Sequence, residues 1–341
     1  MQRSAVKHGV KELFNATLRP FGYEVVPSSA LFDWQRSVRR GPAFVRLELP
    51  QGAAEYLQPA NPRLRDLQAQ YAAFDRSVTE PLVWNPGHVR PVDIQYFRGD
   101  NAYVWQLRGR NMHATGYTLT GYYLQSIDSL DLYSKIAEDH LFGIFTFELD
   151  GRLVSRDLLD SMTEMYFLEK HLGISERKSL TCLDIGAGYG RLAHRMVTAF
   201  PNVERYLCTD GVAVSTFISE YYLRSRGVDR AEVIPLYDIE RRLATEEVDL
   251  AINIHSFSEC QLPAIEWWLR LLERSIVRFL MIVPNSLDHG GTSLQTNTSQ
   301  DFSHIIERHG FRLAAKEPKY RDPVVQEYGI APTYHYLFER R

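Results

Sequence analysis

Apolar positions in the second half of the chain follow two alternating spacings. Runs of strand length that are rich in apolar residues are separated by segments in which apolar residues recur every three or four positions, as on one face of a helix. This alternation predicts an α/β domain with a doubly wound, Rossmann-like parallel sheet. The seven runs that we predict as strands are Leu180 to Asp184, Val203 to Thr209, Ala231 to Leu236, Val248 to Ile254, Phe279 to Val283, Phe311 to Lys316 and Tyr334 to Phe338.

Helical spacing occupies the intervals between these runs. It predicts a helix that begins after Gly190, a second over about 213–225, a third from Ala264 to Leu272 and a fourth near 299–309. A further helical pattern ends at Gly173 and leads directly into the first strand. We therefore place a domain boundary near residue 150, between an N-terminal region (1–150) and a second domain (151–341).

The first 150 residues are less regular and predict an α+β accessory region that recognises the substrate. Residues 1–20 carry a basic amphipathic pattern, which more often packs on its own protein than on an anionic membrane. Helical spacing recurs over residues 61–80 and from Ser129 to Glu138. Between them, Ile94 to Leu107 predicts two short strands around a Gly99-Asp100-Asn101 turn. The aromatic residues of this passage suit either a sugar-binding surface or the core face of a plain hairpin.

The first strand of the second domain runs into a glycine-rich turn, Asp184-Ile-Gly186-Ala-Gly188-Tyr-Gly190. Glycines adopt backbone angles that side chains forbid, and they let a ligand lie against bare main chain beside a helix N-terminus. A dinucleotide fingerprint would need its third glycine at position 191, which is Arg191, so a nicotinamide cofactor is disfavoured. An ordinary turn without a ligand is the alternative. It is weakened by an acid, Asp210, which follows the second strand at about the ~20-residue spacing of a ribose-binding carboxylate.

This turn resembles motif I of the class I S-adenosylmethionine (SAM) methyltransferases, whose sheet has seven strands with the last one antiparallel. The resemblance implies that the turn passes the methionine part of SAM and that Asp210 holds the ribose hydroxyls. It also suggests that Asp238, after the third strand, contacts the adenine. The residues expected to bind SAM are thus Asp184, Gly186, Gly188, Gly190, Asp210 and Asp238.

Chemically active side chains follow the next strands, where an open α/β sheet binds its ligands. Asn253-Ile-His255-Ser-Phe-Ser-Glu259 follows the fourth strand and His289 follows the fifth. An imidazole titrates near neutrality, so His255 is the first candidate for a general base. Glu259 would orient it or act as the base itself, and His289 is a further candidate. Asp288, His289 and Glu259 could also hold a metal, although no spacing requires one, and we expect none.

Three further motifs extend the resemblance towards the sugar O-methyltransferases: the N-x-x-S-F-S-E pattern, F-R-G-D-N-x-Y-V-W-Q from Phe97, and Tyr334-His-Tyr-Leu-Phe338. They imply a SAM-dependent O-methyltransferase acting on a sugar hydroxyl of a glycan, glycolipid or glycosylated metabolite. The alternatives are a methyltransferase of a non-sugar small molecule and a non-catalytic SAM-binding partner in an assembly.

Composition limits the binding partners and the cellular compartment that we expect for this protein. The 39 Lys and Arg residues nearly balance 42 Asp and Glu residues, so no basic excess exists to bind nucleic acid. The three cysteines stand far apart without metal-ligand spacing, and no apolar run approaches the ~20 residues that span a bilayer. We expect a cytoplasmic protein without stable membrane insertion. The number of subunits stays open, and a homo-oligomer is one option.

Overall fold

The computed structural model describes residues 16–18, 20, 44, 45, 47–80, 82–84, 87–285 and 291–340. Contacts divide the chain into residues 1–43 and 44–341, and the fold below is that of the second unit. Most of the amphipathic segment expected over residues 1–20 lies outside the described residues. Because residues 44–341 form one compact unit, the chain on both sides of residue 150 belongs to the same body; a separate substrate-recognition role for the part before it stays a prediction.

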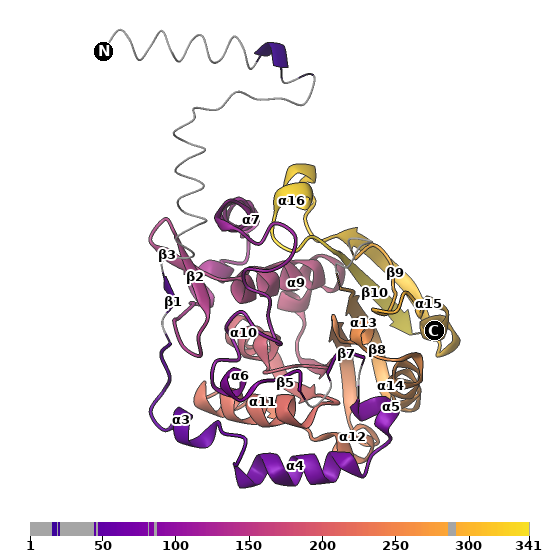
Figure 1. The fold of residues 1–341 in the computed structure, drawn as a ribbon. Helices are drawn as coiled ribbons and strands as arrows, with labels where there is room; N and C mark the ends of the chain where they lie inside the picture. The colour runs from indigo at the N-terminus through magenta and orange to yellow at the C-terminus, as the bar shows by residue number, and fades with distance from the viewer. Residues whose placement is uncertain are drawn as a thin grey trace. The chain divides into compact units, whose positions relative to one another are not determined.

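A seven-stranded sheet forms the centre of this unit (Figure 1). Its strand order is β6-β5-β4-β7-β8-β10-β9, and every strand is parallel to its neighbour except β10, which runs antiparallel to both β8 and β9. Strand order therefore reverses at β4, as in a doubly wound Rossmann-like sheet, and the predicted fold class is confirmed. The strands are β4 (Leu180–Ile185), β5 (Val203–Thr209), β6 (Ala231–Val233), β7 (Glu247–Ile254), β8 (Ile276–Val283), β9 (Phe311–Pro318) and β10 (Tyr334–Arg340).

Helices cover both faces of this sheet. Successive residues at the centres of β7 and β8 are buried, which requires layers on both sides. The helices that connect the strands are α9 (Arg156–Leu172), α10 (Arg191–Ala199), α11 (Ala213–Ser225), α12 (Ile239–Leu243), α13 (Ser256–Glu259), α14 (Leu262–Arg274), α15 (Ser303–Arg308) and α16 (Pro323–Tyr328).

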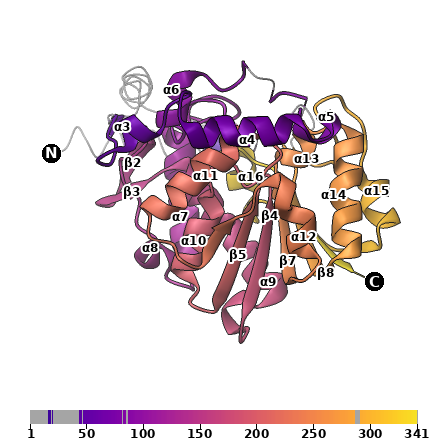
Figure 2. The same cartoon turned by 90° about the horizontal axis from the view of Figure 1, so that it is seen from below.

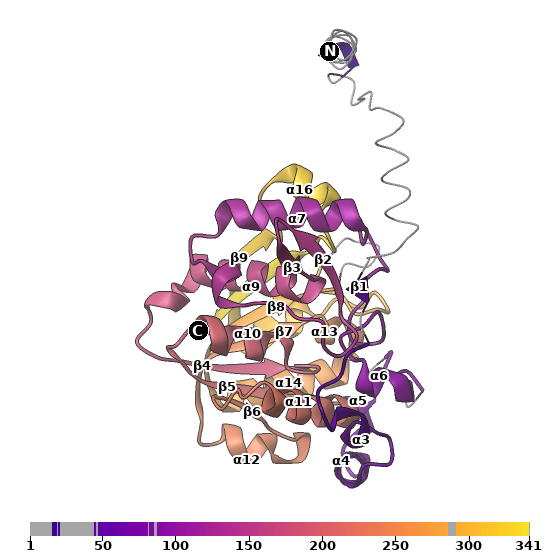
Figure 3. The same ribbon diagram turned by 90° about the vertical axis from the view of Figure 1, so that its left-hand side faces the viewer.

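The segment from residue 44 to residue 154 packs on the helices of this sheet. Its α4 lies along α11, where Arg63 Nη2 bonds Glu220 Oε1 at 2.6 Å (Figure 2). Its α7 lies across α9, with α16 against it (Figure 3). The elements are α3 (Ala53–Tyr56), α4 (Pro62–Ala72), α5 (Arg76–Thr79), α6 (Pro91–Gln95), α7 (Ala114–Ile127), α8 (Leu132–Lys135) and a small sheet of β1 (Phe44–Val45), β2 (Phe145–Leu149) and β3 (Arg152–Val154).

The hairpin predicted for residues 94–107 is wrong. Helix α6 ends at Gln95, and the chain then continues without strands to α7. Side-chain bonds stabilise this segment where a hairpin would have paired strands. Asp100 Oδ1 accepts from the Gln106 backbone N–H at 2.9 Å. Arg98 is fully buried among carboxylates and donates to Glu138 Oε1 at 2.5 Å. These local side-chain bonds offer the backbone an alternative to β pairing.

Candidate functional site

The glycine turn between β4 and α10 has left-handed backbone angles at all three glycines, with φ of 73°, 58° and 86° at Gly186, Gly188 and Gly190. Two of them are required by packing, because a Cβ at Gly186 would collide with Ser256 Oγ and one at Gly190 would lie 3.1 Å from the Leu223 side chain. A Cβ at Gly188 would meet only Tyr103 Cδ1, at 4.0 Å. Gly188 is thus the glycine that presents bare backbone to open space.

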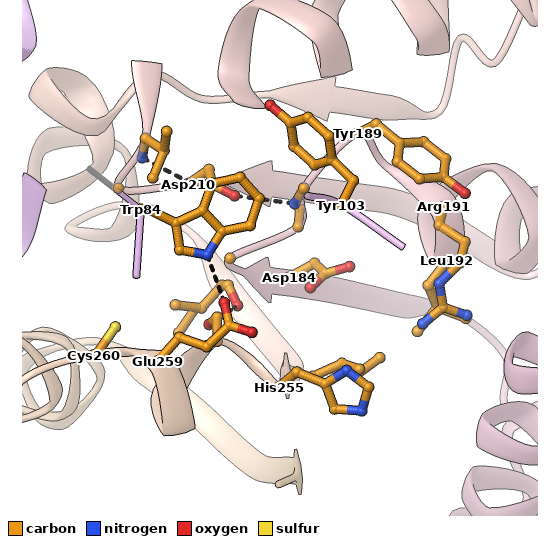
Figure 4. Close-up of a pocket in the computed structure, with 18 of the residues that line it drawn as sticks. Trp84, Tyr103, Asp184, Tyr189, Arg191, Leu192, Asp210, His255, Glu259 and Cys260 are labelled. Atoms are coloured by element: carbon orange, nitrogen blue, oxygen red, sulfur yellow. Dashed lines mark hydrogen bonds between the residues drawn. The ribbon is translucent and has the colours of Figure 1, made fainter. Parts of the chain in front are cut away.

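Asp210 follows β5 and reaches back to this turn. Its Oδ2 accepts from the Gly188 N–H at 3.0 Å and its Oδ1 from the Val212 N–H at 2.8 Å (Figure 4). Burial raises the pKa of Asp210 to about 7, since the low-dielectric surroundings disfavour the charged form. The carboxyl group is therefore fixed in orientation beside Gly188, with lone pairs left for a further donor.

Asp184, near the end of β4, is a second buried acid at the same edge of the sheet. Its Oδ2 accepts from the Tyr206 hydroxyl of the neighbouring strand at 3.1 Å. Burial raises the pKa of Asp184 to about 7 as well. Two carboxyl groups thus lie at the ends of adjacent strands on either side of the glycine turn, as the sequence predicts.

A cavity of about 150 Å³, which we call the turn cavity, is bounded by this turn, Asp184 and Asp210. Its opposite wall comes from the N-terminal part of the chain and from the segment after β7. Residues from that wall include Trp84, Tyr103 and Glu259 (Figure 4). Sequence reasoning missed Trp84, because a single tryptophan in a proline-rich loop belongs to no periodic pattern.

The N-x-x-S-F-S-E segment ties the end of β7 to the end of β4. Asn253 Nδ2 donates to the Ile185 carbonyl at 2.9 Å and to Ser256 Oγ at 2.6 Å, while its Oδ1 accepts from the Phe257 N–H at 3.0 Å. Asn253, the first residue of the motif, therefore fixes the backbone at the ends of β4 and β7. His255, Ser256 and the last residue, Glu259 in α13, also line the turn cavity.

Glu259 forms no hydrogen bond with His255, so the expectation that it orients this imidazole is wrong. Its Oε2 accepts from Trp84 Nε1 at 2.5 Å and its Oε1 from Asn285 Nδ2 at 3.0 Å (Figure 4). Burial raises the pKa of Glu259, against the opposing effect of these two donors. His255 has a left-handed φ of 65°, and burial, helped by the nearby Arg156 guanidinium, lowers its pKa to about 3. The imidazole is therefore neutral at pH 7.

A second cavity, of about 320 Å³, adjoins the turn cavity. The residues that line both cavities include Trp84, Tyr103, Arg191, His255 and Glu259. Tyr103 belongs to the aromatic passage noted in the sequence, and so does Trp105, which lines the second cavity only. The side chains of Glu259 and His255 therefore lie where two neighbouring cavities meet.

One described acid that was predicted to bind SAM does not line the turn cavity. This acid is Asp238, whose carboxylate pairs with Arg241 at 2.7 and 2.8 Å, three residues along the same segment. The backbone after β6 is instead bonded by Tyr71 of α4, whose hydroxyl accepts from the Leu236 N–H at 2.8 Å. The adenine contact expected of Asp238 stays a prediction, which this pairing with Arg241 does not favour. His289 and Asp288 lie outside the described residues.

Metal-binding clusters and membrane-spanning helices are both absent from the residues that the structure describes. Nowhere in this part of the chain do three or more His, Cys, Asp or Glu side chains gather as they would around a metal ion. None of the helices in the described ranges combines the length and apolar character needed to cross a membrane.

Solved structures that align with parts of this chain include two methyltransferases and one cyclase. A SAM-dependent methyltransferase from Aquifex aeolicus aligns at 14% identity over 53% of this chain and 97% of its own, with a TM-score of 0.36. The mitomycin 7-O-methyltransferase MmcR aligns at 17% identity over 68% and 70%, with a TM-score of 0.39. The [4+2]-cyclase SpnF aligns at 16% identity over 67% and 94%, with a TM-score of 0.40. No protein-family model and no curated protein matches the sequence. We therefore base the function on the geometry of this chain's own residues.

Proposed function

We propose that this chain is a SAM-dependent O-methyltransferase whose acceptor is a sugar hydroxyl. The observation that carries the proposal is the pair of adjoining cavities, one built from a glycine turn and two carboxyl groups, the other from aromatic and polar side chains. Glu259 and His255 lie between them. This division matches the needs of a transfer reaction, in which donor and acceptor bind side by side with the reactive groups between them.

The turn cavity fits a sulfonium nucleoside in two respects. Gly188 leaves room for a ligand against its backbone, since a Cβ there would face open space. Asp210 is held rigidly beside it and offers carboxylate lone pairs for the two hydroxyls of a ribose. When bound, SAM supplies an electrophilic methyl group, which passes from its sulfur to the acceptor oxygen and leaves S-adenosylhomocysteine.

Glu259 is the base that we favour for the acceptor proton. A sugar hydroxyl must lose its proton as the new C–O bond forms, and a positioned base accelerates such a step by roughly 10²–10⁴-fold. The raised pKa of Glu259 makes its carboxylate a stronger base than an ordinary glutamate. His255, with a pKa of about 3, accepts a proton less readily, and we assign it to positioning the hydroxyl.

The N-terminal part of the chain supplies the aromatic surface of the second cavity. Trp84, Tyr103 and Trp105 all come from before residue 150. Aromatic faces suit the C–H edges of a sugar ring, which supports a role of this part in substrate recognition. Since aromatic walls also suit a flat, non-sugar acceptor, the test has to distinguish the two.

The test is methyl transfer from SAM labelled in its methyl group, with glycosides and flat phenols supplied in separate reactions. We expect labelled product and S-adenosylhomocysteine with the glycosides, and loss of both with Glu259→Gln. Methylation of the phenols alone would contradict the sugar assignment. Binding of S-adenosylhomocysteine without transfer to any acceptor would favour a non-catalytic binding partner.

A further inference from the structure

The second cavity carries cationic groups whose donors are only partly used. Arg156, at the start of α9, donates from Nε to Asp160 Oδ2 at 3.0 Å and from Nη1 to the Trp105 carbonyl at 2.6 Å. Its Nη2 has no hydrogen-bond partner among the described residues. This nitrogen is not one of the fully buried polar atoms without a partner, so it is not sealed inside the protein. A guanidinium nitrogen is therefore free to bond an occupant of the cavity.

Arg108 and Arg110 add two more such groups. Arg108 donates from Nε to Asp100 at 3.1 Å and from Nη2 to the Asn101 carbonyl at 3.0 Å, while Arg110 uses Nη2 alone, on Glu327 at 2.7 Å. Nη1 of each lacks a hydrogen-bond partner in the described part of the chain. Both side chains are about half exposed, at 51% and 49%, so an incoming anion need not strip them of all water.

The acidic side chains that line the second cavity already have hydrogen-bond partners in the protein. Asp157 is fully buried and accepts from Gln106 Nε2 at 3.1 Å and from Arg98, while Asp160 accepts from Lys319 Nζ at 2.5 Å. Glu259 has a donor on each oxygen, from Trp84 and from Asn285, and keeps lone pairs for the acceptor hydroxyl. Asp157 and Asp160 are thus committed to partners in the protein wall.

Most charges near His255 are paired: Arg191 with Glu164 at 2.8 Å, and Lys319 with Asp160 at 2.5 Å. Arg156 shares Asp160 with Lys319 and is the cation with the largest effect on the pKa of His255, which it lowers. Its unused donor favours a negatively charged occupant over a neutral one.

An aromatic face adjoins these donors. Trp105 is 51% exposed, and the Arg108 guanidinium lies 5.3 Å from the centre of its ring. The Arg108 guanidinium lies over one face of the Trp105 ring, so an exposed aromatic surface for a sugar ring and a planar cation lie together. Arginine forks pair with carboxylate and phosphate oxygens in the same planar geometry.

We propose that the second cavity takes an anionic sugar, one whose carboxylate or phosphate lies on Arg108, Arg110 and Arg156 while its ring packs on Trp105. The hydroxyl to be methylated then lies at the inner end, beside Glu259. This inference rests on the proposed function and names its acceptor class. The chemistry that the arginines recognise is a planar or tetrahedral oxyanion, carried either by a uronic acid or by a phosphorylated or nucleotide-linked sugar.

The test is calorimetric titration of the full chain, saturated with S-adenosylhomocysteine, with three sugar probes. These are a phenyl glucoside, the corresponding phenyl glucuronide and glucose 6-phosphate. We expect at least one anionic probe to bind about tenfold more tightly than the glucoside, the gain typical of a charge-assisted hydrogen bond. The double variant Arg108→Gln/Arg110→Gln should lose this preference and keep its affinity for S-adenosylhomocysteine. The control is Arg270→Gln, which removes an equally exposed arginine, 52% exposed, from α14, away from the cavity, and should change neither affinity.

The titrations with the different probes distinguish the possible results. A preference for the glucuronide identifies a carboxylate acceptor, and a preference for glucose 6-phosphate identifies a phosphorylated one. Equal binding of charged and neutral probes, binding of none, or a charge preference that survives in the double variant would overturn the inference. Failure of S-adenosylhomocysteine itself to bind would instead refute the proposed function.

Discussion

The substitution Gly188→Ala separates the ligand-binding role of the glycine turn from its role in folding. Gly188 has a φ of 58°, and an added Cβ would meet only Tyr103 Cδ1, at 4.0 Å. The protein without ligand should therefore lose only the backbone cost of a left-handed alanine, about 1–2 kcal/mol. A bound ligand that lies against Gly188 would collide with the new methyl group. Overpacking of this kind costs about 1–3 kcal/mol, or roughly 5- to 150-fold in Kd.

Gly173→Ala is the matched control for this experiment. Gly173 ends α9 with a φ of 55°, a Cβ there would meet nothing within 4 Å, and the residue does not line the turn cavity. Urea denaturation should give both variants the same small loss of stability. Calorimetric titration with S-adenosylhomocysteine should show weakened binding in Gly188→Ala alone. Equal affinities in the two variants, both folded, would refute the placement of the ligand against Gly188.

Three more predictions concern the acids of the site. Asp210→Ala should weaken S-adenosylhomocysteine binding by more than about tenfold in the same titration, because it removes a fixed hydrogen-bond partner, while Asp238→Ala should leave it unchanged. A ligand hydroxyl donates to the ionised form of Asp210, whose pKa in the free protein is about 7. The affinity for S-adenosylhomocysteine should therefore rise about tenfold between pH 6 and pH 8. An affinity that does not change with pH would count against this contact. Trp84→Phe removes a donor that lowers the pKa of Glu259, so the acidic limb of the pH–kcat profile should move to higher pH, and an unmoved limb would argue that Glu259 is not the base.

The centre of the sheet was predictable because β7 and β8 are buried on both faces and therefore appear as nearly unbroken apolar runs. The ranges predicted for β5 and α11 coincide with those observed, and β10 is antiparallel as the resemblance implies. The positions of Asp184 and Asp210 at the turn also follow from the sequence, since both acids come directly at or after the ends of strands that lie side by side.

The rest of the site depends on contacts that no local pattern encodes. Trp84 reaches Glu259 from 175 residues away, and nothing in its own loop indicates that partner. The aromatic passage near Asp100 carries a turn signal, but its side chains bond the backbone and prevent a hairpin. The pairing of Asp238 with Arg241, a partner within its own helical turn, likewise does not follow from the position of Asp238 after a strand.

The central claim is that the turn between β4 and α10 binds a sulfonium nucleoside, and a calorimetric titration of the unmodified chain tests it most directly. S-adenosylhomocysteine and NAD would be titrated in parallel at pH 8, where Asp210 is ionised. The account predicts saturable binding of S-adenosylhomocysteine and none of NAD. Saturable binding of NAD without binding of S-adenosylhomocysteine would contradict it.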